Sequence, residues 1–263
     1  MNQVPVLNDL CFVFFLSTKI AQPCPKQTSA GLRLIVFIKR LIRKGEAIPA
    51  AADCNKFECE FIAVAYKRFG ELKVFIQSWI NQTEKNWKLH VIHDGDSKNF
   101  IKIMEEFRNN NPEQISFQCT DIRYNDYGHS LREIGLKNAT GDYVLLTNAD
   151  NYYIPETVKF LNVGIDKAER DKPDVLMFDM VHSHKNPGKQ KKPSYSYFKV
   201  SFHRKYIDMG AAIVSTELAQ KAGFDDKSYA ADASYFEAVS KAKKQSGKKL
   251  AVLKIPRVLL VHN

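Results

Sequence analysis

From Glu58 onward, short apolar runs alternate with segments whose apolar residues recur at helical spacing. Runs typical of strands cover 60–66, 88–96, 115–119, 142–147 and 174–180, and helical patterns cover 70–82, 97–109, 129–139 and 155–170, the last beginning at Pro155. Strands that alternate with helices of about 10 to 15 residues indicate βαβ units. The alternation therefore predicts an α/β fold with a mostly parallel central sheet flanked by helices.

Three polar clusters stand directly after predicted strands. They are Tyr66-Lys67-Arg68, His93-Asp94-Gly95-Asp96 and Asn148-Ala149-Asp150-Asn151. The change is sharpest in GDYVLLTNADNYYIP (141–155), where an apolar run ends in a carboxylate flanked by two amides. In open α/β sheets, ligands bind beyond the carboxyl ends of the strands. The clusters therefore predict a ligand site at this edge of the sheet.

Composition narrows the class of ligand. The chain has 263 residues, 44% of them hydrophobic, and a net charge of +10, which suits a globular protein with an anionic partner. No nucleic-acid motif is recognisable, so we expect a phosphorylated small molecule or a membrane lipid rather than nucleic acid. The five cysteines include no CxxC pair. This usage indicates reduced thiols in a cytoplasmic protein and disfavours a zinc site.

Residues 1–57 are predicted to form an N-terminal extension that is more basic than the rest of the chain. They contain eight Lys or Arg residues and three Asp or Glu residues, and their apolar runs are too short to span a bilayer. The segment 31–44 predicts a basic amphipathic helix. Such a helix can lie on the inner face of a membrane and attract anionic lipid. The alternatives are a helix packed on the domain and a leader without a role in function.

The chain from about residue 57 to 263 resembles the family 2 inverting glycosyltransferases of the GT-A fold. The resemblance rests on AVAYKR (63–68), HDGD (93–96), SLREIGLKNATGDYVLLTNADNYYIP (130–155), MGAAIVSTELAQKAGFDD (209–226), AADASYFEAV (230–239) and the terminal VHN. It implies a GT-A nucleotide-diphospho-sugar transferase domain over 58–263. The implied reaction moves a sugar, with inversion, from a UDP-sugar or a similar donor to a hydroxyl of a glycan or lipid-linked acceptor in polysaccharide biosynthesis.

In that family an acidic triplet, usually Asp-x-Asp, holds a divalent cation that bridges the donor's diphosphate. Here the triplet reads Asn148-Ala149-Asp150. By resemblance, Asp150 is the metal ligand, Asn148 a weaker contact with ribose or metal-bound water, and His262 a further metal or diphosphate ligand. The expected ion is Mn²⁺ or Mg²⁺. A helix cap at 148–151 and a solvent-exposed His262 are the alternatives.

The same resemblance implies a nucleotide pocket formed by Tyr66, Arg68, Asp94 and Arg132. Tyr66 and Arg68 would lie next to the base and ribose. Asp94 would accept a hydrogen bond from the base, which favours uracil, and Arg132 would meet the pocket from the helix before the acidic strand. A simple turn at DGD and a solvated helix arginine are the alternatives for Asp94 and Arg132.

Asp232 is the predicted catalytic base. Inverting transfer is a single displacement, so a general base must take the proton of the acceptor hydroxyl. The family usually provides an acidic pair, Glu-Asp, at the start of a late helix, whereas this sequence has Ala231-Asp232. Asp225 and Asp226 are possible substitutes, and Asp232 could instead cap a helix over 232–245.

Several other classes of protein compete with the transferase. The departures at Asn148 and Ala231 would suit a degenerate, noncatalytic relative. The net charge would suit a basic polyanion- or nucleic-acid-binding protein. A nucleotidyltransferase would need a glycine-rich loop after the first strand, and AYKRFGELK (65–73) is not one. The three strand-end clusters together favour the glycosyltransferase.

Overall fold

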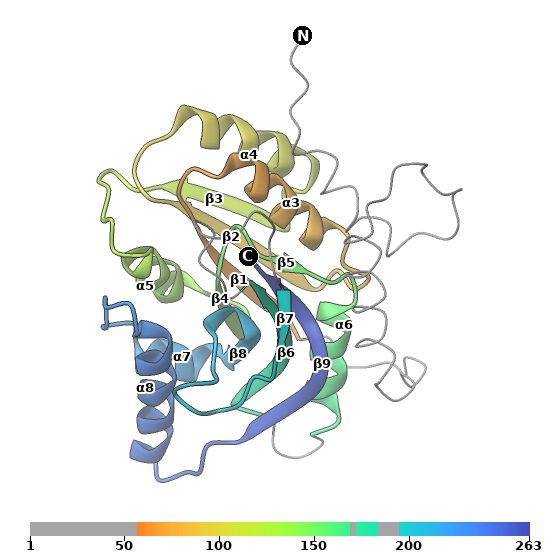
Figure 1. Cartoon of the computed structure of the whole chain (residues 1–263), viewed down its shortest axis with the longest axis vertical. Coiled ribbons are helices and arrows are strands. Elements are labelled where there is room, and N and C mark those ends of the chain that lie inside the picture. The colour runs from red at the N-terminus through yellow and green to blue at the C-terminus, as the bar shows by residue number, and fades with distance from the viewer. Residues whose placement is uncertain (1–56, 169–171, 184–194) are drawn as a thin grey trace. The chain divides into compact units, whose positions relative to one another are not determined.

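The computed structural model describes residues 57–168, 172–183 and 195–263, and Figure 1 shows the alternation predicted for its first half. The elements are β1 (Cys59–Ala65), α3 (Phe69–Ile80), β2 (Trp87–His93), α4 (Lys98–Asn110), β3 (Ile115–Cys119), α5 (His129–Asn138) and β4 (Tyr143–Asn148). All seven residues of β1 are buried, as expected for a strand covered on both faces. The predicted extension 1–57, with its helix at 31–44, lies outside the described residues except for Phe57.

The second half contains strands of uneven length and four further helical segments. It comprises β5 (Tyr152–Tyr153), α6 (Thr157–Asp166), β6 (Val175–Ser183), β7 (Tyr195–Phe198), the 3₁₀ helix η1 (Met209–Ala211), β8 (Ala212–Ser215), α7 (Thr216–Ala222), α8 (Ala231–Gln245) and β9 (Val252–His262). The prediction that Pro155 begins a helix is wrong by two residues. The N–H of Thr157 donates to the carbonyl of Ile154, so Pro155 lies in a turn before α6.

The described strands form one nine-stranded sheet in the order β3-β2-β1-β4-β8-β6-β9-β5, with β7 paired to β6. The strands β3, β2, β1 and β4 are parallel to one another. β8 runs antiparallel to both β4 and β6, whereas β9 is parallel to β6. The α/β fold is therefore confirmed as a GT-A-like fold with a mixed sheet, in which the parallel part carries the three strand-end clusters.

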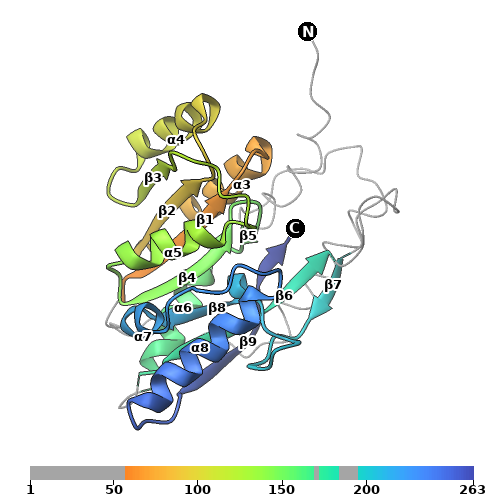
Figure 2. The same cartoon turned by 90° about the vertical axis from the view of Figure 1, so that its left-hand side faces the viewer.

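Helices cover both faces of this sheet. Figure 2 shows α5, α7 and α8 in front of the sheet, with α6 behind it. α5 packs on β1 and β2, and α7 packs on α8. On the opposite face, aromatic rings fill the core, with the ring centroids of Trp79 and Tyr153 4.6 Å apart. The described chain therefore has a layer of helices on each side of one sheet.

α5 approaches the sheet unusually closely. A Cβ placed on Gly135 would lie 2.3 Å from Cγ2 of Ile62 on β1, a separation that real side chains do not adopt. Glycine is therefore required here for packing, although its backbone is helical. The close approach matters for function, because α5 also carries Arg132.

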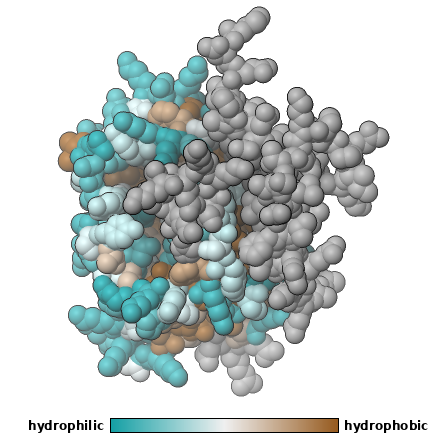
Figure 3. Space-filling model, in the orientation of Figure 1, coloured by the Kyte–Doolittle hydropathy of each residue, from teal (hydrophilic) through white to brown (hydrophobic). Residues whose placement is uncertain are grey.

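The surface of the described residues carries few apolar groups. On the face shown in Figure 3, hydrophilic residues predominate among the coloured atoms. None of the helices in the described ranges is long and apolar enough to cross a membrane. The two described cysteines, Cys59 and Cys119, are free thiols.

Two helical glycines give a matched test of this packing. Gly135→Ala should destabilise the protein by about 1–3 kcal/mol, because the added methyl overpacks the contact between α5 and β1. Gly70→Ala in α3 meets no atom within 4 Å. It should stabilise the protein by about 0.5 kcal/mol through helix propensity. Urea unfolding of both variants checks this, and equal effects of the two substitutions would contradict the close approach.

Candidate active site

The three predicted clusters meet at one edge of the sheet. β1 lies between β2 and β4, and the register pairs Ala65 with His93 and Val64 with Asn148. The ends of these strands, together with residues 123–131, surround a pocket of about 390 Å³. Its lining includes Tyr66, Arg68, Asp94, Arg123, Asn125, Tyr127, Asn148 and Asp150. The three clusters therefore lie together around one pocket at the carboxyl ends of the parallel strands, and ligand binding there stays a prediction.

Backbone strain is concentrated in this pocket. Among the described residues, the non-glycine residues with positive φ are Lys67, Arg68, Asn125 and Tyr127. All four line the pocket. The left-handed conformation costs roughly 1 kcal/mol or more for a residue with a side chain, and such residues cluster where function requires a particular geometry. This strain was not predictable from the sequence, because none of the four residues is a glycine.

Asp150 faces Arg68 across the pocket. Nη1 of Arg68 lies 2.5 Å from Oδ2 of Asp150, and the Arg68 side chain is 61% exposed. Exposed pairs of this kind contribute little to stability. The other carboxylate oxygen, Oδ1, is buried and has no hydrogen-bond partner among the described residues. A buried acceptor without a donor indicates a place for a ligand or a cation.

Asp94 is buried and holds the neighbouring loop. Its carboxylate accepts hydrogen bonds from the backbone N–H groups of Tyr124 (2.7 Å) and Asn125 (3.0 Å). Nε of Arg123 lies 3.9 Å from the same carboxylate, and the Arg123 guanidinium lies 4.0 Å from the centre of the Tyr66 ring. Asp94 thus shapes the pocket, and its contact with a base remains a prediction. Arg123 and Asn125 were missed in the sequence, where they lie in a loop without a family motif.

Arg132 is buried rather than solvated, which excludes the alternative of a surface arginine. Its Nη1 donates to the carbonyl of Tyr127 at 2.9 Å and lies 3.1 Å from Nδ1 of His129. Its Nη2 donates to Oδ1 of Asn148. Burial lowers the pKa of Arg132, and the carboxylate of Asp232 opposes this shift most strongly. Arg132 therefore joins α5 to the end of β4.

Asp232 lies in the first turn of α8 and does not cap that helix. α8 begins at Ala231, and no side chain caps it. Oδ2 of Asp232 accepts a hydrogen bond from the N–H of Met209 at 3.3 Å. Burial raises the pKa of Asp232, the nearby Asp208 raises it further, and Arg132 lowers it. Such a raised pKa suits a residue that exchanges a proton near neutral pH.

Asp208 was missed in the sequence analysis, although it directly precedes the MGAA motif. Its Oδ1 accepts a hydrogen bond from the N–H of Gly210, and its Oδ2 lies 3.7 Å from Nε2 of His262. The ring of His262 also stacks on His182, with centroids 4.5 Å apart. The pairing of Tyr152 with Val261 brings the end of β9 alongside the 148–151 cluster. Asp208 therefore links Asp232 to the C-terminal strand.

A divalent ion is compatible with these residues. Nδ1 of His262, like Oδ1 of Asp150, is buried and lacks a hydrogen-bond partner in the described part of the chain. An imidazole nitrogen and a carboxylate oxygen together suit Mn²⁺. Within 57–168, 172–183 and 195–263, no three His, Cys, Asp or Glu side chains form a group that could hold an ion alone. A bound diphosphate would have to provide the remaining ligands.

Asp226 is hydrogen-bonded within the loop before α8 and is poorly suited to act as the general base. Its Oδ1 accepts a hydrogen bond from the N–H of Ser228. Hydrogen bonds from Ser234 and then from Ser228 lower the pKa of Asp226 to about 2. A carboxylate this acidic is a poor proton acceptor at neutral pH. Of Asp226 and Asp232, Asp232 therefore has the environment that better suits a base.

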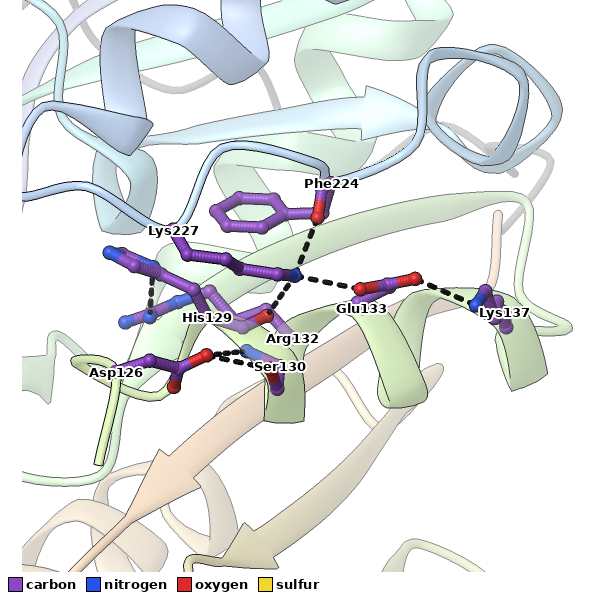
Figure 4. Close-up of polar contacts among 8 residues, drawn as sticks. All are labelled: Asp126, His129, Ser130, Arg132, Glu133, Lys137, Phe224 and Lys227. Atoms are coloured by element: carbon purple, nitrogen blue, oxygen red, sulfur yellow. Dashed lines mark hydrogen bonds and ion pairs between the residues drawn. The ribbon is translucent and has the colours of Figure 1, made fainter. Parts of the chain in front are cut away.

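Lys227 fixes the same loop on α5, as Figure 4 shows. Its Nζ lies 2.7 Å from Oε2 of Glu133 and donates to the carbonyls of Phe224 and His129. At the start of the same helix, the N–H and the hydroxyl of Ser130 donate hydrogen bonds to Asp126 in the preceding loop. The segment leading to Asp232 is thereby held against the helix that carries Arg132.

The buried His129 predicts a pH dependence of stability. Burial lowers its pKa below the ordinary value of 6.5 and Arg132 lowers it further, whereas Asp232 and Asp126 oppose the shift. Below about pH 6.5 the unfolded chain binds a proton that the folded protein refuses, so stability should fall as the pH decreases toward the folded-state pKa. Urea midpoints between about pH 7.5 and 5.5 should change less in His129→Gln than in the wild type. The exposed His203→Gln should leave the pH dependence unchanged, and an unchanged dependence in His129→Gln would contradict the assignment.

Solved structures of glycosyltransferases share this fold. Staphylococcus aureus TarS matches with a TM-score of 0.60 and 20% identity over 78% of this chain and 36% of that chain. TarS 1–349 in complex with UDP-GlcNAc matches with a TM-score of 0.61 and 18% identity, over 78% of this chain and 58% of that one. The Pyrobaculum calidifontis mannosyltransferase PcManGT, in complex with GDP-Man and Mn²⁺, matches with a TM-score of 0.57 and 14% identity, over 88% of this chain and 63% of that one.

These likenesses establish the fold, and the chain covers less than two thirds of the length of each of these structures. A comparison with curated protein sequences found no match. The family model described as "Glycosyl transferase family 2" matches residues 61–229, which is more than half of the chain. That range includes the pocket residues from Tyr66 to Asp150, whereas Asp232 and His262 lie beyond it. The chain is therefore a member of glycosyl transferase family 2.

Proposed function

We propose that this protein transfers a sugar from a nucleotide-diphosphate donor, with UDP favoured, to a hydroxyl of an acceptor, with inversion. The observation that carries the proposal is the pocket at the ends of β1, β2 and β4, with the unpartnered oxygen of Asp150 at its rim. The structures of TarS with UDP-GlcNAc and of PcManGT with GDP-Man support a nucleotide-sugar donor for this fold.

In this proposal the nucleotide occupies the pocket between Tyr66 and Asp150. Tyr66 and Arg123 offer a ring face and a guanidinium plane to the base. Asp94 still has acceptor capacity after its two backbone hydrogen bonds, and it can receive the imide N–H of uracil. Arg68 provides a largely exposed positive charge for the diphosphate. The basic character of the pocket thus matches an anionic donor.

Asp150 and His262 are the residues that would hold Mn²⁺ or Mg²⁺. Such an ion, when bound, offsets the negative charge that develops on the leaving diphosphate. PcManGT was solved with Mn²⁺, which supports a divalent ion in this fold. Arg68 lies against Asp150 and would have to share that carboxylate with the ion or move to the diphosphate.

Asp232 is the proposed general base. Its burial and the neighbouring Asp208 favour the protonated form, so the ionised carboxylate is more basic than an ordinary aspartate. It would take the proton of the acceptor hydroxyl as that oxygen attacks the anomeric carbon and the bond to the diphosphate breaks. Binding of the nucleotide would hold the sugar in line for this attack.

A degenerate, noncatalytic relative is the second candidate, because Asn148 and Ala231 replace acidic residues of the family. Binding of a polyanion, including nucleic acid, is the third. We place the enzyme in the cytoplasm, acting in polysaccharide biosynthesis on a glycan or lipid-linked acceptor. Residues 31–44 would provide a peripheral membrane contact.

The nucleotide site is tested by thermal shift with UDP, GDP and CDP, each with Mn²⁺ or with chelator. UDP with Mn²⁺ should raise Tm, because a ligand that binds only the folded state stabilises it. Asp150→Ala should abolish the Mn²⁺-dependent part of the shift. Asp166→Ala is the matched control, since Asp166 is also mostly buried with one unpartnered oxygen but lies at the end of α6. No shift with any nucleotide would exclude an active transferase.

The catalytic proposal is tested by Asp232→Asn, which keeps the shape of the side chain but removes its basicity. Turnover should fall by about 10²–10⁴-fold while the UDP-induced shift in Tm is retained. Asp226→Asn, in the loop before α8, should keep most of the activity. Full activity of Asp232→Asn in a donor-consumption assay would rule out Asp232 as the base.

A further inference from the structure

Tyr127 and Tyr229 are the two most exposed aromatic side chains among the described residues. Their side chains are 68% and 87% exposed. A single exposed tyrosine is ordinary on a protein surface. These two are in contact, however, with ring centroids 5.9 Å apart and ring planes at 75°. They form one aromatic edge-to-face pair that remains open to solvent.

The backbone beneath both rings is fixed. Tyr127 has φ of +60°, a strained conformation for a residue with a side chain, and Arg132 donates to its carbonyl at 2.9 Å. The segment before Tyr229 is anchored to α5 by Lys227 (Figure 4) and by the hydrogen bond from Ser228 to Asp226. Because the backbone that carries the two exposed rings is held in place, binding a ligand to them costs less conformational entropy.

The two tyrosines belong to the two segments that carry the functional parts of the site. Tyr127 lines the pocket proposed for the nucleotide. Tyr229 lies two residues before α8, which carries Asp232 in its first turn. A ligand on the pair would therefore contact one segment that lines the donor pocket and another that leads into the helix of the base, and an acceptor hydroxyl must be held between donor and base.

The chemistry of the pair indicates the class of ligand. A pyranose ring presents a face of C–H groups that packs on an aromatic ring, with its hydroxyls directed to polar neighbours. Charged residues, including Asp126 and Lys227, flank the two tyrosines in the chain. Two rings in such surroundings are too small an apolar area for a stable protein interface, which needs about 800 Å² per partner. They suit a polar ligand with one apolar face.

We propose that Tyr127 and Tyr229 form the acceptor subsite, which binds a pyranose sugar through its C–H face and directs one of its hydroxyls toward Asp232. This inference rests on the proposed transferase function. It adds that the acceptor group is a cyclic sugar rather than an acyclic polyol or a side chain of a protein.

Saturation-transfer NMR tests the subsite without catalysis. The probes are methyl β-D-glucopyranoside and methyl α-D-mannopyranoside, with sorbitol as an acyclic polyol, each with and without UDP. We expect transfer to at least one pyranoside and none to sorbitol. Tyr229→Ala should weaken pyranoside binding by about tenfold or more. Tyr229→Phe should retain binding because the ring remains, and Tyr206→Ala is the control for an exposed tyrosine elsewhere.

Three results would overturn the subsite: no transfer to either pyranoside, equal transfer to sorbitol, or unchanged transfer in Tyr229→Ala. Thermal shift with UDP separates this inference from the proposed function. A UDP shift without pyranoside binding would remove the subsite and keep the donor site. Pyranoside binding that depends on Tyr229, without a shift in Tm by any nucleotide, would support a sugar-binding site and contradict the proposed transferase function.

Discussion

The guanidinium of Arg132 lies buried between α5, the end of β4 and the carboxylates near α8, in a place where a charge is costly unless it is paired. Its hydrogen bonds to Tyr127, His129 and Asn148 fix the position of three segments at once. Its positive charge also lowers the pKa of Asp232, against the upward shift that burial and the neighbouring Asp208 cause. The buried guanidinium of Arg132 therefore connects the pocket, the proposed base and the proposed metal ligand. The close packing of Gly135 on β1 holds the helix that carries it.

This arrangement explains physically how the site accommodates Asn148 and Ala231, the two departures from the family pattern. Asn148 accepts a hydrogen bond from Arg132 without neutralising it, so the charge remains available to the carboxylates around α8. Ala231 is completely buried, where an additional carboxylate would be costly. The second acidic group near Asp232 comes instead from Asp208, on a different segment. The site thus keeps two neighbouring carboxylates although the sequence pair is broken.

The parallel half of the fold was predictable because its strands are buried on both faces and read as continuous apolar runs. β1 and β4 show this most clearly, and the clusters at their ends follow from the rule for parallel sheets. The antiparallel direction of β8 was not predictable, because the sequence of a four-residue strand does not indicate the direction in which it pairs with its neighbours. Asp208 and Arg123 were missed for a related reason: each acquires its role only through contacts with residues far away in the chain. The left-handed residues in the pocket were likewise invisible, because a tyrosine or an arginine does not predict positive φ.

We propose that the ends of β1, β2 and β4 bind a nucleotide beside a metal at Asp150. A crystal structure with UDP and MnCl₂, with anomalous data collected at the manganese edge, tests it most directly. We expect uracil in the pocket between Tyr66 and Asp94 and an anomalous peak next to Oδ1 of Asp150. UDP bound elsewhere on the protein, or a peak remote from both Asp150 and His262, would contradict it.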